Sequence, residues 1–359
     1  QAPDWLKFHI LFLLAAVLFT ASNLLTPYLL HRMIGSEEVY RATMSYLDWR
    51  VYGFFFSFIA VMFRAFYVST TNTKILTANS VVMVLTNVVL NYILIFGKFG
   101  FPALGIAGAA IASSISEAVS VMFFVIYTWK KVDYKKYGLF RFTRVDFRML
   151  GQILSVSIWV MIQHGIAFGG WFIFFIAMEH LGERPLAITN VVRSISSFLF
   201  MFVNAFASTN SSLVSNLIGA GESDRVLPLS RRMIGLCYAF VLPIGILIAM
   251  FPSTVLRIYT DNPDLIASSI PSLWVMLSSY LFAVPGFIYF FSVSGTGNTR
   301  RALEIDMASI FVYVLYILYV AVWLRADVAV CWTTEYVYNI MILSSFFYLW
   351  KGNWRNKKI

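Results

Sequence analysis

The sequence predicts an all-α integral membrane protein with ten membrane-spanning helices. Three observations point to this class: the composition, the spacing of long apolar stretches, and the distribution of positive charge between them. Of the 359 residues, 60% are hydrophobic and 12% are charged, and the mean hydropathy is +0.77. Soluble domains are about half apolar and about one quarter charged. A soluble fold would therefore leave a large apolar surface in water.

A helix needs about 20 apolar residues to cross the hydrocarbon core of a bilayer. The first apolar stretch is too long for the core of a signal peptide, and no small-residue cleavage site follows it, so we interpret it as a spanning helix. Connections that are mostly short, and mostly marked by Gly, Pro or charge, separate the stretches. Ten stretches qualify: 8–30, 42–67, 75–96, 103–128, 150–179, 186–217, 233–252, 266–292, 303–324 and 327–350.

Lys and Arg are distributed unequally between the two sides that ten helices define. One side carries 18 of the 27 Lys and Arg residues and the other carries 6, while Arg50, Arg64 and Arg193 fall inside helices. Cytoplasmic loops of membrane proteins are enriched in Lys and Arg. We therefore expect a multi-pass protein of the plasma or inner membrane with both termini cytoplasmic. The net charge of +10 then reflects topology, and no nucleic-acid partner is expected.

An internal repeat relates the two halves of the chain. Residues 24–74 align without a gap with residues 250–300, and the two copies close on similar tetrads at 71–74 and 297–300. The copies are six helices apart, so both cross the membrane in the same direction. Parallel repeats of this kind, related by an axis along the membrane normal, are a transporter architecture.

The repeat predicts two pseudo-symmetric lobes. We expect an N-terminal lobe at 1–130 with four of its six helices, a cytoplasmic connection at 131–149, and a C-terminal lobe with six helices at 150–359. The same offset predicts that about 76 residues, enough for two further helices, precede the N-terminal lobe in the complete protein.

Polar residues recur along the stretch 186–217. A stripe of small residues can serve close helix packing, which explains its serines. Packing explains Arg193 and the two asparagines poorly, so we interpret the stripe as facing a water-filled substrate cavity. We expect Asn190, Arg193, Asn204 and Ser208 to line that cavity. The steps of three, four or seven residues place the whole set on one helix face: Asn190, Arg193, Ser197, Asn204, Ser208, Ser211 and Ser215.

Four residues of the first half are candidates for ion coupling. Asn87 and Asn91 lie one helical turn apart, and paired carboxamides can bind a cation or a polar solute, or form an interhelical hydrogen bond. Glu117 is the carboxylate near the middle of its apolar stretch, where an acid titrates, binds a cation or pairs with a base. Asp48 is the fourth candidate. It lies two positions from Arg50, a spacing that points the side chains to different faces.

Residues of the second half carry weaker signals. Gln163 and His164 lie in the middle of the stretch 150–179, where they can line a substrate cavity, relay protons or form structural hydrogen bonds. The sequence contains none of the HExxH, GxSxG or GxxxxGK[ST] motifs of enzymes. Cys237 and Cys331 lie in apolar stretches, and we interpret both as packing residues. No catalytic residue, bound metal or cofactor is expected, apart from a coupling ion.

At this point the sequence resembles a family, the multidrug and toxic compound extrusion (MATE) transporters. The segment 87–97, NVVLNYILIFG, looks like the fifth helix of that family, and 105–113, GIAGAAIAS, looks like the start of its sixth. The segment 215–221, SNLIGAG, is similar to the end of its eighth helix, and 295–300, GTGNTR, to the turn before its eleventh. The resemblance covers the whole chain, from the third helix of the family to the twelfth.

The sequence departs from the family at positions that matter for ion coupling. The first-half cation site of the family commonly uses an Asp on helix one, with an Asn and an Asp on helix five. Asn87 matches that Asn, whereas Asn91 stands where the Asp is usual and Glu117 stands where a Gln is frequent. Some members also carry acids within helices seven and ten. This sequence has none in the middle of either, and Gln163 is the nearest polar group on helix seven.

The resemblance implies a secondary antiporter that exports amphipathic, often cationic organic compounds in exchange for H⁺ or Na⁺. Its partners would be small-molecule substrates and membrane lipid, with no obligate protein partner. A related alternative is a flippase for lipid-linked saccharides, which a large basic cavity near Arg50 and Arg193 would favour. A membrane enzyme or scaffold is the other class, and it would need a His, Asp or Cys cluster at one depth.

Overall fold

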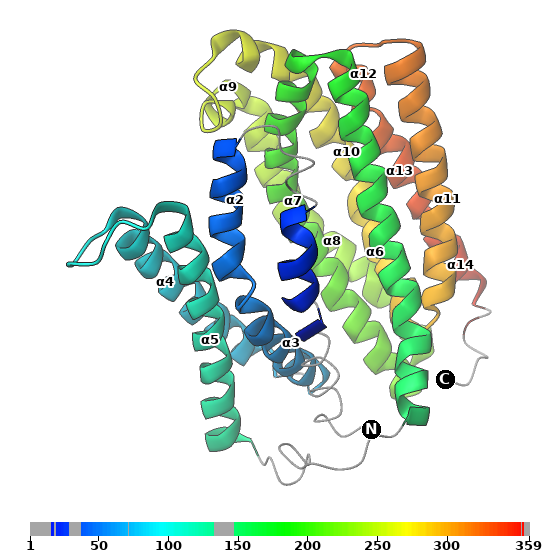
Figure 1. Ribbon diagram of the computed structural model, residues 1–359. Coiled ribbons are helices and arrows are strands. Elements are labelled where there is room, and N and C mark those ends of the chain that lie inside the picture. Colours follow the sequence, from blue (N-terminus) through cyan, green and yellow to red (C-terminus); the bar gives the residue numbers. More distant parts are fainter. Residues whose placement is uncertain are drawn as a thin grey trace. The chain divides into compact units, whose positions relative to one another are not determined.

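The computed structural model describes residues 16–17, 19–28, 37–70, 72–132, 147–352 and 354. Every regular element in these ranges is helical, as the composition predicts (Figure 1). The chain divides into two compact units, Gln1–Met149 and Leu150–Ile359. The expected stretch 8–30 is described over 16–17 and 19–28, which are helical. Most of the expected connection 131–149 lies outside the described residues.

The first unit contains a broken helix and a helical hairpin. The hairpin turns at Gly97, whose φ of 65° ends the first of its helices in the left-handed conformation. Its helices approach closely at Gly108, where a Cβ atom would lie 2.6 Å from the Leu94 carbonyl oxygen. The helices are α2 (Glu37–Arg50), α3 (Gly53–Ser69), α4 (Lys74–Phe96) and α5 (Gly105–Lys131).

The second unit is a bundle in which α7 and α10 form the most extensive helix pair. A Cβ atom at Gly295 of α10 would lie 2.5 Å from the Ser211 carbonyl oxygen of α7, so a glycine is needed at this crossing. The elements are α6 (Phe147–Leu181), α7 (Glu183–Gly219), the 3₁₀ turn η1 (Ser223–Arg225), α8 (Val226–Met250), α9 (Pro252–Leu256), α10 (Pro263–Gly295), α11 (Thr299–Ile317), the π-helical η2 (Leu318–Trp323), α12 (Val328–Cys331), α13 (Thr334–Leu343) and α14 (Ser345–Lys351).

Local chemistry fixes the ends and bends of α10. The Asn262 side chain accepts hydrogen bonds from the backbone N–H groups of Asp264 and Leu265, with a proline at the first helical position. Further along, Pro285 cannot donate to the carbonyl of Leu281. The Tyr238 hydroxyl of α8 donates to that carbonyl instead, which satisfies the group that the proline leaves free and ties α8 to α10.

The described helices bear out most of the predicted spans and correct two. Among the described residues, seven helices are long and apolar enough to cross a membrane, or eight if α2 and α3 form one bent span. The predicted span 42–67 is interrupted at Val51 and Tyr52, and its halves differ in direction by 50°. The predicted span 327–350 consists of the three short helices α12, α13 and α14. Hydropathy averages over such breaks, so it does not reveal them.

Candidate functional site

A charged pair lies at the break between α2 and α3. The guanidinium of Arg50, the last residue of α2, donates from Nη2 to Glu117 Oε1 at 2.7 Å and from Nη1 to Oε2 at 3.1 Å. Glu117 belongs to α5, and the two side chains are 27% and 16% exposed. Two parallel charge-assisted bonds fix both the position and the orientation of a carboxylate. This pair therefore joins the end of one helix to the middle of another within the first unit.

The residues around the pair accommodate it at the break. A Cβ atom at Gly53 would overlap the Arg50 guanidinium and would lie 2.5 Å from Glu117 Oε2. The Ser114 hydroxyl, one turn before Glu117, donates to the Trp49 carbonyl at 3.0 Å. That bond uses a backbone acceptor at the end of α2. Gly53 thus leaves the space in which the charged pair fits, and Ser114 holds the chain end beside it.

The asparagines of α4 face a neighbouring side of α5. Asn87 donates to the hydroxyls of Ser113 and Ser116, at 3.3 Å each, and accepts a 2.8 Å bond from Asn91. The Asn91 carbonyl oxygen is buried without a hydrogen-bond partner. Because buried polar atoms are normally paired, this oxygen is available to a cation or a donor. Asn87 bonds to serines of α5, whereas Glu117 bonds to Arg50. The predicted ion-coupling residues therefore do not bond to one another as one cluster.

Asp48 is exposed on α2. The structure gives it no hydrogen bond or ion pair to the described residues. The spacing predicts that Asp48 and Arg50 point to different helix faces, and Arg50 indeed pairs with Glu117.

The second unit contains a buried carboxylate that the sequence analysis did not select. Asp306 of α11 is 2% exposed, and its Oδ1 accepts a 2.9 Å hydrogen bond from the Tyr338 hydroxyl of α13. Gln163 and His164 of α6 lie near the same carboxylate and contribute to its electrostatic environment. His164 itself is exposed and bonds to the Val160 carbonyl at 2.8 Å. Carboxylate, phenol and amide groups therefore converge from α6, α11 and α13.

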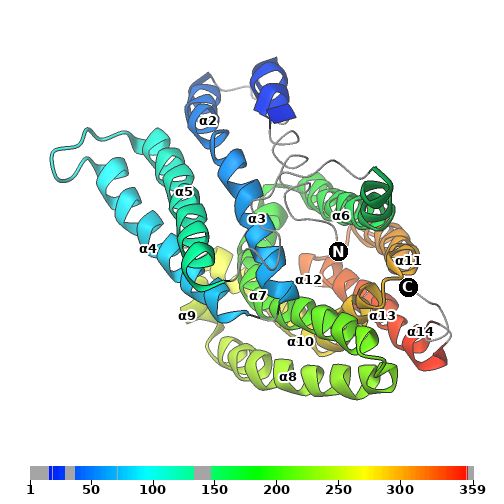
Figure 2. The ribbon, with the colours of Figure 1, turned by 90° about the horizontal axis from the view of Figure 1, so that it is seen from below.

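Arg193 of α7 and Glu335 of α13 are two further charged groups of the second unit. The Arg193 guanidinium of α7 lies over the rings of Trp171 and Phe175 of α6, with Cζ 4.6 Å and 4.4 Å from the two ring centroids. Such stacking holds a cation by its attraction to the ring faces. Arg193 also interacts electrostatically with Glu335 of α13 and the buried Tyr313 of α11, without a direct ion pair. Figure 2 shows α13 between α10 and α11 in this unit.

The polar stripe of α7 is largely exposed. Asn190, Asn204 and Ser208 are exposed, and Arg193 is half-buried. Ser208 donates to the Asn204 carbonyl one turn earlier. The opposite face of α7 is buried in the core of the second unit through Val192, Leu199, Val203 and Ala207. Arg193 approaches the cluster around Glu335, whereas no contact joins Asn204 or Ser208 to Asp306.

The residues that the sequence analysis missed had a readable signal. Asp306 and Glu335 are acids inside the predicted spans 303–324 and 327–350, whose first turns also carry Glu304 and Asp327, and an acid inside a span is functional by default. Asn210 of α7 has a structural role instead. Its buried amide donates to the hydroxyls of Ser230 and Ser292 at 3.2 Å and 2.6 Å. That cluster joins three core helices.

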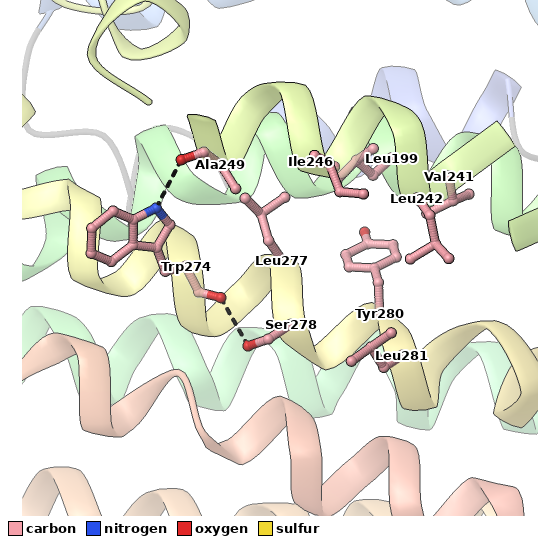
Figure 3. A pocket seen from close by; sticks show the side chains of 11 residues that line it. Leu199, Val241, Leu242, Ile246, Ala249, Trp274, Leu277, Ser278, Tyr280 and Leu281 are labelled. Carbon is pink, nitrogen blue, oxygen red and sulfur yellow. Dashed lines mark hydrogen bonds between the residues drawn. The ribbon is translucent and has the colours of Figure 1, made fainter. Parts of the chain in front are cut away.

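An apolar groove of about 330 Å³ lies apart from these polar groups, mainly between α8 and α10 (Figure 3). Trp274 at one end donates from its indole to the Ala249 carbonyl at 3.3 Å. No lining residue is charged, which makes the groove unsuitable for an ion. Its walls are Leu199, Val241, Leu242, Gly245, Ile246, Ala249, Trp274, Leu277, Ser278, Tyr280 and Leu281.

Two other predictions concern metals and thiols. The described residues contain no group of three His, Cys, Asp or Glu side chains that could hold a metal ion. Cys237 and Cys331 are buried and free, in agreement with the packing role that the sequence predicts.

Comparison with known proteins shows the family to which the chain belongs. The MatE family profile matches residues 6–93 and 166–322, in both units and over more than half of the chain. The chain belongs to the MatE family. It is 28% identical to the probable multidrug resistance protein NorM of Thermotoga maritima over 239 residues, which cover 66% of this chain and 50% of that protein. It is 26% identical to the probable multidrug resistance protein YoeA of Bacillus subtilis over 75% of this chain and 59% of that protein.

Solved structures show the same fold for this MatE chain. A MOP-superfamily transporter from Pyrococcus furiosus, whose binding pocket is described as reversed in polarity, has a TM-score of 0.86 at 16% identity and covers 97% of this chain and 78% of its own. A MATE protein in complex with MaL6 has a TM-score of 0.83 at 18% identity, over 97% and 79% of the two chains. The chain spans about half the length of the curated relatives it matches.

Proposed function

We propose that this MatE protein is a secondary active transporter that exports amphipathic, often cationic organic compounds in exchange for inward-moving H⁺ or Na⁺. Family membership and the names of the multidrug resistance relatives support the assignment. The observation that carries it is a carboxylate inside the helices of each unit, Glu117 and Asp306. Acidic groups in apolar helices are costly, and they mark ion pathways and proton relays.

In the first unit, Glu117 is our candidate for the group that exchanges H⁺. A protonated carboxyl group is neutral and cannot hold a guanidinium through two charge-assisted bonds. Proton uptake would therefore release Arg50 from Glu117 and loosen the contact that fixes the break between α2 and α3. Deprotonation would restore the pair. Such a cycle would link proton binding to a change in the direction of a helix, a movement that could be coupled to alternating access.

The side-chain amides of Asn87 and Asn91 in α4 are candidates for additional ligands of the coupling ion. Asn91 cannot release a proton because it is a carboxamide, but its unpartnered oxygen can act as a ligand. Asp48 remains a candidate entry point for the ion from the exposed side of α2.

In the second unit, the oxygens around Asp306 are the alternative site, and they suit Na⁺. Asp306, Tyr338 and Gln163 would supply carboxylate, phenol and amide oxygens, the ligand types that hard cations prefer. We propose that His164, Arg193 and the α7 residues Asn190, Asn204 and Ser208 line the path of the substrate.

The contacts of the two arginines support the exporter over a lipid-linked saccharide flippase. Arg50 is bound by Glu117, and Arg193 is held by two aromatic rings near Glu335. Neither is free to contribute to a large basic cavity as the flippase would require.

The test is transport by the purified protein in sealed vesicles. With a fluorescent organic cation inside, an imposed gradient of H⁺ or Na⁺ should accelerate its movement across the membrane, and dissipation of that gradient by an ionophore should remove the acceleration. Vesicles without protein are the control. Movement that is insensitive to both gradients would contradict antiport.

A further inference from the structure

We propose that a pocket at one end of the second unit binds the phosphate headgroup of an anionic membrane lipid. The pocket has a volume of about 450 Å³ and lies between the first turns of α11 and the helix α14. Figure 1 shows these helix ends at the same end of the bundle. The lining residues combine cationic, polar and apolar side chains: Asn298, Arg301, Ile305, Ser344, Phe347, Tyr348 and Lys351.

The charge of the pocket favours an anion. Arg301 Nη1 donates to Glu304 Oε2 at 2.5 Å, and Arg300 Nε lies 3.4 Å from the other oxygen of the same carboxylate. Glu304 is thus shared between two guanidinium groups. Lys351 adds a third cation on the opposite wall, at the end of α14. Arg301 and Lys351 line the pocket, and Arg300, which shares Glu304 but does not line the pocket, adds to the positive charge that a phosphate diester could neutralise.

Polar donors are also oriented for an oxygen ligand. The Asn298 amide donates to the Tyr348 hydroxyl at 2.6 Å, so the hydroxyl keeps its own hydrogen for a ligand. Because the Asn298 side chain is used in this way, it does not cap α11. The first backbone N–H groups of α11, the positive end of a helix dipole, therefore add to the field of the two arginines.

The apolar side of the pocket favours a lipid over a free phosphate. Ile305 and Phe347 line the same pocket as the cations. Phe347 and the neighbouring Trp350 are 63% and 65% exposed, and aromatic residues of this kind collect at the membrane interface. Such an amphipathic pocket matches a headgroup attached to acyl chains.

The position along the membrane agrees with an anionic lipid. This end of the unit lies on the side that the Lys and Arg distribution predicts to be cytoplasmic, where anionic lipids are enriched, and basic pockets between spanning helices bind such headgroups. Contacts within the chain also hold one wall of the pocket in place. Gly352, with φ of 68°, ends α14, and the buried Trp354 donates to the Leu349 carbonyl at 3.2 Å. These contacts fix the helix end that carries Lys351.

The test compares lipid binding by two double variants of the purified protein in detergent. R301Q/K351Q removes two cations from the pocket. R231Q/R232Q removes the same charge from exposed positions of α8 that do not line it. Native mass spectrometry would then follow binding of phosphatidylglycerol, phosphatidylcholine and inorganic phosphate. At about 1 kcal/mol per cation, R301Q/K351Q should bind phosphatidylglycerol about thirtyfold more weakly, whereas R231Q/R232Q should bind like the unmodified protein.

The other ligands and two milder variants separate the explanations. Phosphatidylcholine and inorganic phosphate should bind weakly to every form. Y348F keeps the ring, removes the hydroxyl donor together with the acceptor of the Asn298 bond, and should weaken phosphatidylglycerol binding, whereas N298A removes that bond but keeps the hydroxyl and should retain more of the binding than Y348F. Equal loss in both double variants, or equal binding of phosphatidylcholine, would overturn the proposal, as would inorganic phosphate competing fully with the lipid. Because the readout is binding, its failure would leave the proposed antiport untouched.

Discussion

At the scale of single residues, the role of Glu117 depends on its hydrogen-bond partner as much as on the acid itself. The sequence identifies an acid inside an apolar helix, but it leaves open whether that acid titrates, binds a cation or pairs with a base. The structure provides the partner, Arg50, 67 positions away. Pattern analysis could not supply that pairing, because it depends on how α2 and α5 pack together. The same holds for Asp306 and Tyr338, which come from different helices.

Gly53 provides a test of the charged pair at this scale. Gly53→Ala should destabilise the protein by about 1–3 kcal/mol, the usual cost of overpacking, because the added methyl group would displace Arg50 or Glu117. Gly235→Ala is the matched control, since a Cβ atom there meets nothing within 4 Å and alanine favours a helix over glycine. Thermal unfolding in detergent measures both. A Gly53→Ala protein as stable as the control would show that the pair does not need this space.

At the scale of elements, the sequence locates most helices because a membrane span requires a long apolar run. It cannot locate breaks inside such runs. The bend between α2 and α3 falls at Val51 and Tyr52, just before Gly53, in an aromatic-rich segment, and the series α12 to α14 is interrupted within an equally apolar stretch. A tertiary contact, the bond from Ser114 to the Trp49 carbonyl, holds the end of α2 at the first break, and a sequence pattern does not show such a contact. Periodicity is more informative for α7, whose polar stripe and buried face follow helical spacing.

The α7 stripe predicts a pattern of accessibility in the membrane. Cysteines introduced at Asn204 and Ser208 should react rapidly with a water-soluble thiol reagent, because we expect that face to line the substrate path. Cysteines at Phe202 and Phe206, which pack against the core of the second unit, should react slowly. The native Cys237 and Cys331 are replaced by alanine to remove background. Similar rates at all four positions would indicate that the stripe serves helix packing.

At the scale of the whole molecule, the internal repeat predicts how the two halves cross the membrane. Copies that are six helices apart run in the same direction, so positions 72 and 298 should lie on the same side. Single cysteines at these two positions should both be protected from an impermeant thiol reagent added outside intact cells. A cysteine at Asp261, on the side with fewer Lys and Arg, should be labelled. Labelling of position 72 or 298 alone would contradict the parallel repeat.

The measurement that tests the central claim most directly is gradient-driven efflux from vesicles containing the Glu117→Gln protein. Glutamine keeps an oxygen that can accept from Arg50 but cannot exchange a proton, so folding and substrate binding should persist. We predict that H⁺-driven efflux is lost in Glu117→Gln and retained in Asp306→Asn, with substrate binding measured separately in each. Unchanged pH dependence of efflux in Glu117→Gln, together with loss in Asp306→Asn, would contradict the account and assign ion coupling to the second unit.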